Sequence, residues 1–193
     1  MNNEKSGWTY GDLPHWTDPL VFVTFRLADS LPVNSLSEMR CFDKEWLDKY
    51  RSEWTDEIDE QYKRYRKKLE NDLLDKALGS CILKRYDVRQ IVEDTLMHFN
   101  NERYLLHAFV IMPNHVHLLI QMYESVRLQD AMHSIKSFSA HKINELLQTK
   151  GVVWEREYYD RFIRDSHHYH TVVNYIENNP KHCYRGEYTL YLS

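Results

Sequence analysis

The sequence predicts an α+β fold, a ferredoxin-like split βαβ sandwich, and the order of its elements is the main reason. Short segments rich in β-branched and aromatic residues alternate with longer segments in which apolar residues recur every three or four positions. With one long helical segment set aside, the order is β, α, β, β, α, β, α. Two βαβ halves around a central hairpin give a four-stranded antiparallel sheet with helices on one face, and the last helix can cover the other face.

The N-terminal half supplies the first strand, a long helical segment and the first helix of the sandwich. Residues 1–19 hold glycine and proline and should be irregular, and the strand LVFVTFRL follows at Leu20–Leu27. From 43 to 78, apolar residues fall on one helical face and charges on the other, which predicts one or two solvated helices inserted in the domain. The basic run at 63–68 could instead contact DNA, although a solvated face is the commoner reason for such a run. The next helix is expected at Asp87–Phe99.

The C-terminal half supplies the hairpin and the remaining elements. Strands are expected at Arg103–Met112 and, after the Pro113-Asn114 connection, through the VHLLIQ segment up to Gln121. A helix at 128–147 and an extended segment at 152–163 follow. The last helix is expected to run from an N-cap at Ser166 to Asn179, because helices usually stop before a proline.

Length and composition indicate one globular domain spanning residues 1–193. The formal charge of −4 excludes the strongly basic composition of a non-specific nucleic-acid binder. The chain has 3 cysteines, without a CxxC pair, and no apolar run long enough to span a membrane. These features favour reduced thiols and a cytoplasmic location.

A pair of histidines in the hairpin is the first candidate site. His115 and His117 are two residues apart in a strand, so both imidazoles should leave on one face while Val116 and Leu118 face the other way. This pattern predicts a half-buried strand with the histidines on its open face. Two imidazoles together can bind one divalent cation, but two hydrogen-bonded strand histidines are the simpler alternative.

The last helix adds a phenol and a carboxamide. Tyr175 and Asn179 are four residues apart in YIENN and therefore share a helix face. A phenol is a weak nucleophile at neutral pH, but it can attack a phosphodiester when a metal polarises the phosphate. A helix tyrosine is more often a core residue with its hydroxyl satisfied, and that alternative stays open.

Several motifs together resemble the HUH single-strand nucleases, and within them the REP-associated tyrosine transposases, relatives of the IS200/IS605 single-tyrosine (Y1) transposases. The resemblance lies in LVFVTFRLADSLP (20–32), PNHVH (113–117), IKSFSAHKINELL (135–147), WEREYYDRFIRD (154–165) and YIENNP (175–180). It covers most of the chain outside residues 37–85.

The resemblance implies a transposase-like endonuclease and strand transferase that acts on single-stranded DNA carrying hairpins. His115 and His117 would bind Mg²⁺ or Mn²⁺, Tyr175 would form a 5′-phosphotyrosine, and Asn179 would stand where IS200/IS605 enzymes have a glutamine ligand. It leaves open a monomer or a homodimer, in which the tyrosine helix can serve the partner's site.

Other polar residues are weaker candidates. Four cationic side chains could contact DNA phosphates or simply be solvated: Lys136, Lys142, Arg161 and Arg164. Asp165 with His167 and His168 could hold a second metal, but fits a helix N-terminus better. Rival tyrosine nucleophiles are Tyr158, Tyr159 and Tyr169.

Two other functions compete with strand transfer. One is a DNA-hairpin binding module that does not cleave, and the other is a phosphodiesterase that uses the same metal pair with water as nucleophile.

Overall fold

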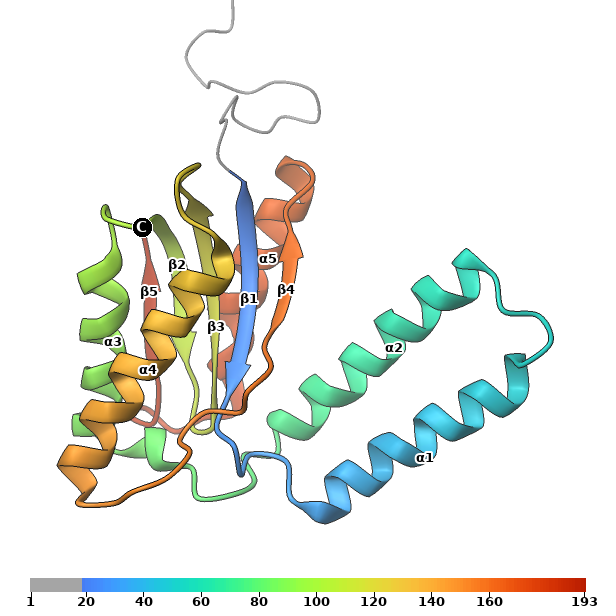
Figure 1. The fold of residues 1–193 in the computed structure, drawn as a ribbon, viewed down its shortest axis with the longest axis horizontal. Helices are drawn as coiled ribbons and strands as arrows, with labels where there is room; N and C mark the ends of the chain where they lie inside the picture. The colour runs from blue at the N-terminus through green and yellow to red at the C-terminus, as the bar shows by residue number, and fades with distance from the viewer. Residues whose placement is uncertain (1–18) are drawn as a thin grey trace, which may run out of the picture.

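The computed structural model describes residues 19–193, so all but the last residue of the irregular segment expected at 1–19 lies outside the described part (Figure 1). No helix among the described residues is long and apolar enough to cross a membrane. The elements, in chain order, are β1 (Leu20–Arg26), α1 (Val33–Tyr50), α2 (Asp56–Leu74), η2 (Ile82–Lys84), α3 (Tyr86–Phe99), β2 (Tyr104–Ile111), β3 (His115–Met122), α4 (Leu128–Leu147), β4 (Tyr159–Phe162), α5 (Ser166–Asn178), η3 (Asn179–His182) and β5 (Thr189–Leu192).

The sheet has the order β4-β1-β3-β2-β5, and every neighbouring pair is antiparallel. Its first four strands follow the ferredoxin-like order 4-1-3-2, so the predicted fold class is confirmed. The sheet has five strands rather than four, because the four-residue β5 pairs with the free edge of β2. The extended segment expected at 152–163 forms a regular strand only over its last part, β4, with a separate bridge from Trp154 to Leu27.

Both faces of the sheet are covered, which decides where each side of β3 points. In Figure 1, α3 and α4 lie on one face and α5 lies on the other. Val116, Leu118 and Ile120 enter the larger core with α3 and α4, and Leu119 enters a second core with Val172 and Ile176 of α5. Each such apolar side chain contributes about 1.5–3 kcal/mol when buried. The strand is therefore buried on both faces, and the half-buried strand expected from the sequence is corrected.

The helical segment expected at 43–78 consists of two helices that begin earlier and are separated at residues 51–55. α1 and α2 form an antiparallel hairpin that projects from the body beside β4 (Figure 1). We call it the helical hairpin. Thr55 caps α2 by accepting from the Ile58 N–H at 3.3 Å, which explains why the second helix begins there.

The base of the helical hairpin is attached to the sheet at several points. Leu73 and Leu74 pack with Leu31 and Met39 in a small core. Gly79 follows with a φ of +85°, where a Cβ would lie 2.4 Å from the Asp29 carbonyl oxygen, so this connection requires glycine. These contacts bring the C-terminal end of α2 against the loop before β3.

Candidate active site

The two histidines of β3 lie side by side, and other residues hold their Nδ1 atoms. His115 Nδ1 is 2.8 Å from Asn114 Oδ1, and His117 Nδ1 is 2.9 Å from Thr24 Oγ1 on β1. Because a carboxamide oxygen only accepts, the proton of His115 is on Nδ1, and its Nε2 is an acceptor. The two Nε2 atoms face each other at 3.1 Å. Imidazoles oriented through Nδ1 in this way present Nε2 to a metal ion in many proteins.

Asn114 is itself fixed by the helical hairpin. Its Nδ2 donates to the carbonyl oxygens of Leu74 and Leu78, each at 3.2 Å. These two bonds define which end of the carboxamide is the oxygen and direct that oxygen at His115. The carbonyl oxygens at the end of α2 thus help to fix the tautomer of His115 by orienting Asn114.

Burial keeps both rings uncharged. His115 and His117 are each 1% exposed. Burial, with a smaller contribution from the Lys67 ammonium, lowers the pKa of His115 to about 3. Burial also lowers the pKa of His117 far below its ordinary value, assisted by His115 and Lys67. At neutral pH the rings therefore carry no charge and need not lose a proton before binding a cation.

α5 brings Tyr175 to the histidine pair. The phenol oxygen is 3.1 Å from His117 Nε2, and the ring lies edge-on to Phe22. The side chains of Asn179, at the end of α5, and Asn71, on α2, lie close enough to the phenol to lower its pKa. Asn179 therefore shares the helix face of Tyr175, as the four-residue spacing predicts.

The environment of Tyr175 keeps its phenol protonated. Burial raises its pKa above the ordinary value, and the carboxylates of Asp75 and Asp72 raise it further. The carboxamides of Asn179 and Asn71 lower the pKa, each by less than burial raises it. An additional positive charge at this position would be needed to favour the phenolate.

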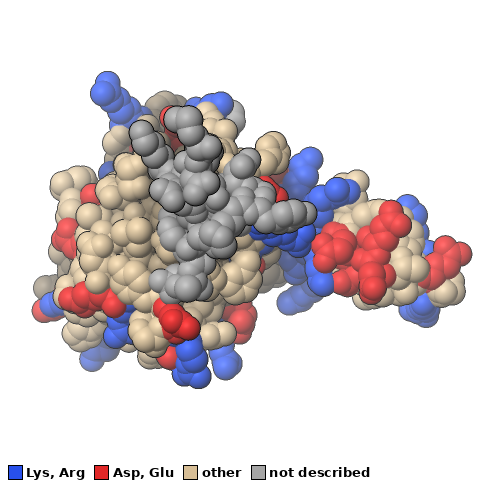
Figure 2. Space-filling model, turned by 90° about the horizontal axis from the view of Figure 1, so that it is seen from above, with Lys and Arg blue, Asp and Glu red and all other residues tan. Residues whose placement is uncertain are grey.

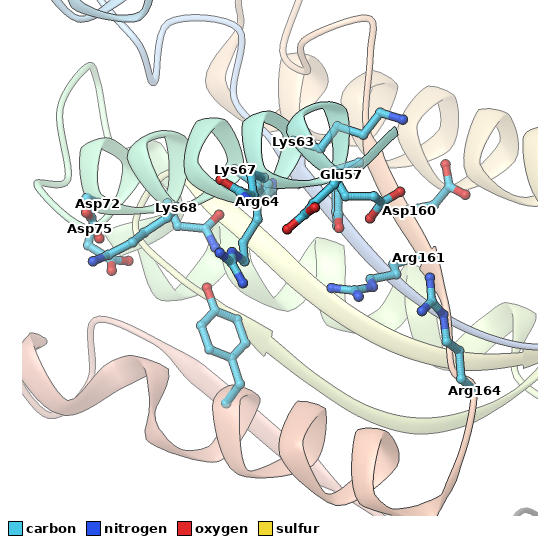
Figure 3. A pocket seen from close by; sticks show the side chains of 15 residues that line it. Glu57, Lys63, Arg64, Lys67, Lys68, Asp72, Asp75, Asp160, Arg161 and Arg164 are labelled. Carbon is cyan, nitrogen blue, oxygen red and sulfur yellow. The ribbon is translucent and has the colours of Figure 1, made fainter. Parts of the chain in front are cut away.

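A cleft of about 960 Å³ lies between α2 and the β4–α5 side of the body, and Tyr175 lines it. Arg64 and Arg161 point into the cleft from opposite sides in Figure 3. Arg161 and Arg164 form no ion pair with a carboxylate anywhere in residues 19–193. The cationic lining residues are Lys63, Arg64, Lys67, Lys68, Arg161 and Arg164, and the acidic ones are Glu57, Glu60, Asp72, Asp75 and Asp160.

The charges are not spread evenly along the cleft. In the sequence of α2 most carboxylates come near the start and the end, and the four cations that line the cleft lie in its middle turns. Figure 2 shows Lys and Arg side chains gathered where the helical hairpin meets the body, with Asp and Glu farther out. The basic run at 63–68 therefore faces the cleft in part and is not only a solvated helix face.

The structure does not bring every predicted site residue to Tyr175. Arg161 and Arg164 line the cleft, but Lys136 donates to the Arg156 carbonyl at 2.6 Å on the α4 side of the body. Lys142 pairs with Glu145 on the surface of α4. Neither lysine lines this cleft.

The rival groups have other partners. Tyr169 lies 3.3 Å from His107 Nδ1, and the Lys67 ammonium stacks 4.3 Å from the ring centroid of Tyr159, which also lines the cleft. Asp165 accepts from the His168 N–H at 2.7 Å and is the N-cap of α5. The predicted N-cap at Ser166 was therefore wrong by one residue, and Asp165 has the helix-terminal role expected for it.

The sequence profile of the family described as "Transposase IS200 like" matches residues 80–179, slightly more than half of the chain. The chain belongs to this family. The resemblance seen in the sequence is thereby confirmed at the family level. The matched range of this IS200-like transposase contains the histidine pair, Tyr175 and Asn179, but neither helix of the helical hairpin.

Individual relatives are more distant. An uncharacterised protein of Haemophilus influenzae is 30% identical over a 114-residue alignment, and the match covers 48% of this chain and 62% of that protein. The chain thus spans under two thirds of this curated relative's length. A structure of a REP-associated tyrosine transposase bound to a REP hairpin is 16% identical, with a TM-score of 0.48 over 86% of this chain and 70% of that one. A candidate transposase from Deinococcus radiodurans R1 is 15% identical, with a TM-score of 0.41 over 86% of this chain and 93% of that one.

Proposed function

We propose that this IS200-like transposase is a metal-dependent single-stranded DNA endonuclease and strand transferase that acts at hairpins through a 5′-phosphotyrosine on Tyr175. The observation that carries the proposal is the position of the phenol, whose oxygen lies 3.1 Å from Nε2 of a buried histidine pair. REP-like hairpins are proposed as the substrate because the YIENNP and YYDRFIRD motifs resemble those of REP-associated transposases.

The residues fit a Mg²⁺ or Mn²⁺ ion. Adjacent ligands of an octahedral ion with bonds of about 2.1 Å lie about 3 Å apart, close to the 3.1 Å between the two Nε2 atoms. Asn179 adds a buried Oδ1 that has no hydrogen-bond partner among the described residues. His115, His117 and Asn179 would thus hold the ion, which when bound would polarise a phosphate oxygen and favour ionisation of a nearby phenol.

The hydrogen bond of Tyr175 to His117 suits this chemistry. The lone pair on His117 Nε2 can serve either the phenol or a cation, so cation binding would release the phenol toward the cleft. The Tyr175 oxygen then attacks phosphorus, and the bond from phosphorus to the 3′ oxygen breaks. The phenol loses a proton and the 3′ oxygen gains one. The new phosphotyrosine retains the phosphodiester bond energy, which permits rejoining to another 3′-hydroxyl.

The cleft supports single-stranded DNA as the substrate. Grooves that hold single strands combine cations for the backbone with aromatic faces for the bases. Here Arg64, Arg161 and Arg164 line the same cleft as Tyr159 and Tyr175. The phenol lies at the histidine pair of the same chain, which favours a site completed within one protomer.

The test uses single-stranded oligonucleotides that carry a hairpin and a labelled flank. With Mn²⁺, the wild type should form a covalent adduct that survives denaturing electrophoresis. Tyr175→Phe should form none while still shifting the hairpin in a native gel, and Tyr159→Phe, which alters the other cleft tyrosine, should retain the adduct. An undiminished adduct with Tyr175→Phe would refute the assignment.

The same experiment separates the competing functions. Hairpin binding without an adduct at any Mg²⁺ or Mn²⁺ concentration would support a non-cleaving DNA module. Hydrolysis of a chromogenic phosphodiester that is insensitive to Tyr175→Phe would support a phosphodiesterase with water as nucleophile.

A further inference from the structure

Two carboxamides, not one, meet the phenol of Tyr175. The side chains of Asn179 and Asn71 both lie close enough to the phenol to influence its pKa, and Asn71 lines the same cleft as Tyr175. In both residues Oδ1 is buried and has no hydrogen-bond partner among the described residues. Leaving such an atom unsatisfied costs about 1–3 kcal/mol, so two of them around one hydroxyl indicate a missing partner that both oxygens share.

Asn71 comes from the helical hairpin, outside the range 80–179 that the family profile matches. Its position is nevertheless well fixed. Two and three residues farther along the chain, Leu73 and Leu74 are buried in the small core. The carbonyl oxygen of Leu74 accepts from Asn114, the residue that orients His115. The side chain of Asn71 faces the same cleft as Tyr175.

The donor types around the phenol point to a hard divalent cation. Carboxamide oxygens and imidazole nitrogens are suitable ligands for Mn²⁺, and an octahedral ion accepts six. Two nitrogens from β3 and one oxygen from each asparagine would fill four positions and leave two for phosphate or solvent oxygens. All four donors are neutral, and the nearby carboxylates of Asp72 and Asp75, which already raise the pKa of Tyr175, would partly balance the charge of the ion.

The Lys67 ammonium opposes a cation here, since its charge reaches both histidines. Its effect is reduced by Glu70, whose carboxylate lies 3.1 Å from Nζ. Lys67 and the carboxylates of Asp72 and Asp75 thus all come from α2 and the residue that follows it.

We propose that Asn71 of α2 is a fourth protein ligand of the cation held by His115, His117 and Asn179. This inference rests on the proposed function, because it concerns the same cation. It makes the helical hairpin a part of the active site and not an appendage to it.

The test measures Mn²⁺ binding to the full chain without DNA, by calorimetry and by loss of the electron paramagnetic resonance signal of free Mn²⁺. Asn71→Ala should raise the Kd for Mn²⁺ at least about tenfold, as loss of a group that supports a metal typically does, and Asn179→Ala should act similarly. Gln61→Ala, which removes another carboxamide of α2 that lines the cleft, should leave the Kd unchanged. Wild-type affinity in Asn71→Ala, with weakened binding in Asn179→Ala, would overturn the proposal.

A second substitution guards against misfolding. Asn71→Asp keeps an oxygen ligand and adds charge, so it should bind Mn²⁺ more tightly than the wild type, whereas Gln61→Glu controls for added charge alone. Equal effects of these two acidic variants would overturn the inference. Failure of the wild type to bind Mn²⁺ would overturn the proposed function as well, whereas an Asn71-specific failure would leave it intact.

Discussion

Mild acid should destabilise the metal-free protein, because the folded state holds two histidines that cannot easily accept protons. His115 has a pKa of about 3 in the folded chain, against 6.5 for an ordinary histidine. Between these values the unfolded chain binds a proton that the folded chain does not. Stability is therefore complete above pH 6.5 and falls as the pH drops toward 3.

The size of the effect follows from the pKa difference. From pH 7.5 to 5.0, His115 alone should remove about 2 kcal/mol from the free energy of unfolding. His117 is shifted in the same direction and adds to the loss. His107 and His168 also have lowered pKa values, so part of the total belongs to them.

The assay is urea unfolding at pH 7.5, 6.5 and 5.0 with a chelator present. A variant with His115→Gln and His117→Gln isolates the pair. Between pH 7.5 and 5.0 its free energy of unfolding should also fall, but this loss should be smaller than the loss in the wild type by at least about 2 kcal/mol. His168→Gln is the control, because this side chain lies outside the pair. Equal losses in the wild type and the double variant would show that the paired histidines are not held neutral by burial.

Three further predictions concern the site and its supports. Thr24→Val removes the partner of His117 Nδ1 and should weaken Mn²⁺ binding about tenfold in calorimetry; unchanged affinity would contradict the role given to this hydrogen bond. Gly79→Ala should lower the free energy of unfolding by at least about 2 kcal/mol in urea, because its Cβ would collide with Asp29; a loss below the error of the fit would contradict this. Arg161→Ala should weaken binding of single-stranded DNA and make the slope of log K against log salt concentration shallower by about 0.7. Lys142→Ala should change neither quantity, and equal effects of the two substitutions would place the DNA outside this cleft.

The periodicity of the sequence was sufficient to predict the sandwich fold and to predict which site residues share a strand face or a helix face. Alternation along β3 correctly placed His115 and His117 together on one side, and the spacing of Tyr175 and Asn179 correctly placed them on one helix face. The last helix was expected to cover this face, and α5 does so, but the alternation along β3 alone did not reveal that both histidines are fully buried. The short β5 was missed because four residues carry too little pattern.

The contribution of the helical hairpin could not be read from the sequence. Asn71 lies among charged residues in an amphipathic helix, and only the tertiary structure brings it to Tyr175. Asn114 stands next to the histidine motif, but its role depends on carbonyl oxygens at the end of α2. Thr24 belongs to a strand whose pairing with β3, opposite His117, is set by the sheet register.

The central claim is that imidazoles, carboxamides and a phenol from separate elements surround one cation. Anomalous diffraction from a Mn²⁺-soaked crystal, collected at the manganese edge, tests it directly. We expect one peak within about 2.3 Å of Nε2 of both His115 and His117 and of the carboxamide oxygens of Asn179 and Asn71. A well-occupied peak elsewhere, with the Tyr175 phenol still hydrogen-bonded to a metal-free His117, would contradict the account.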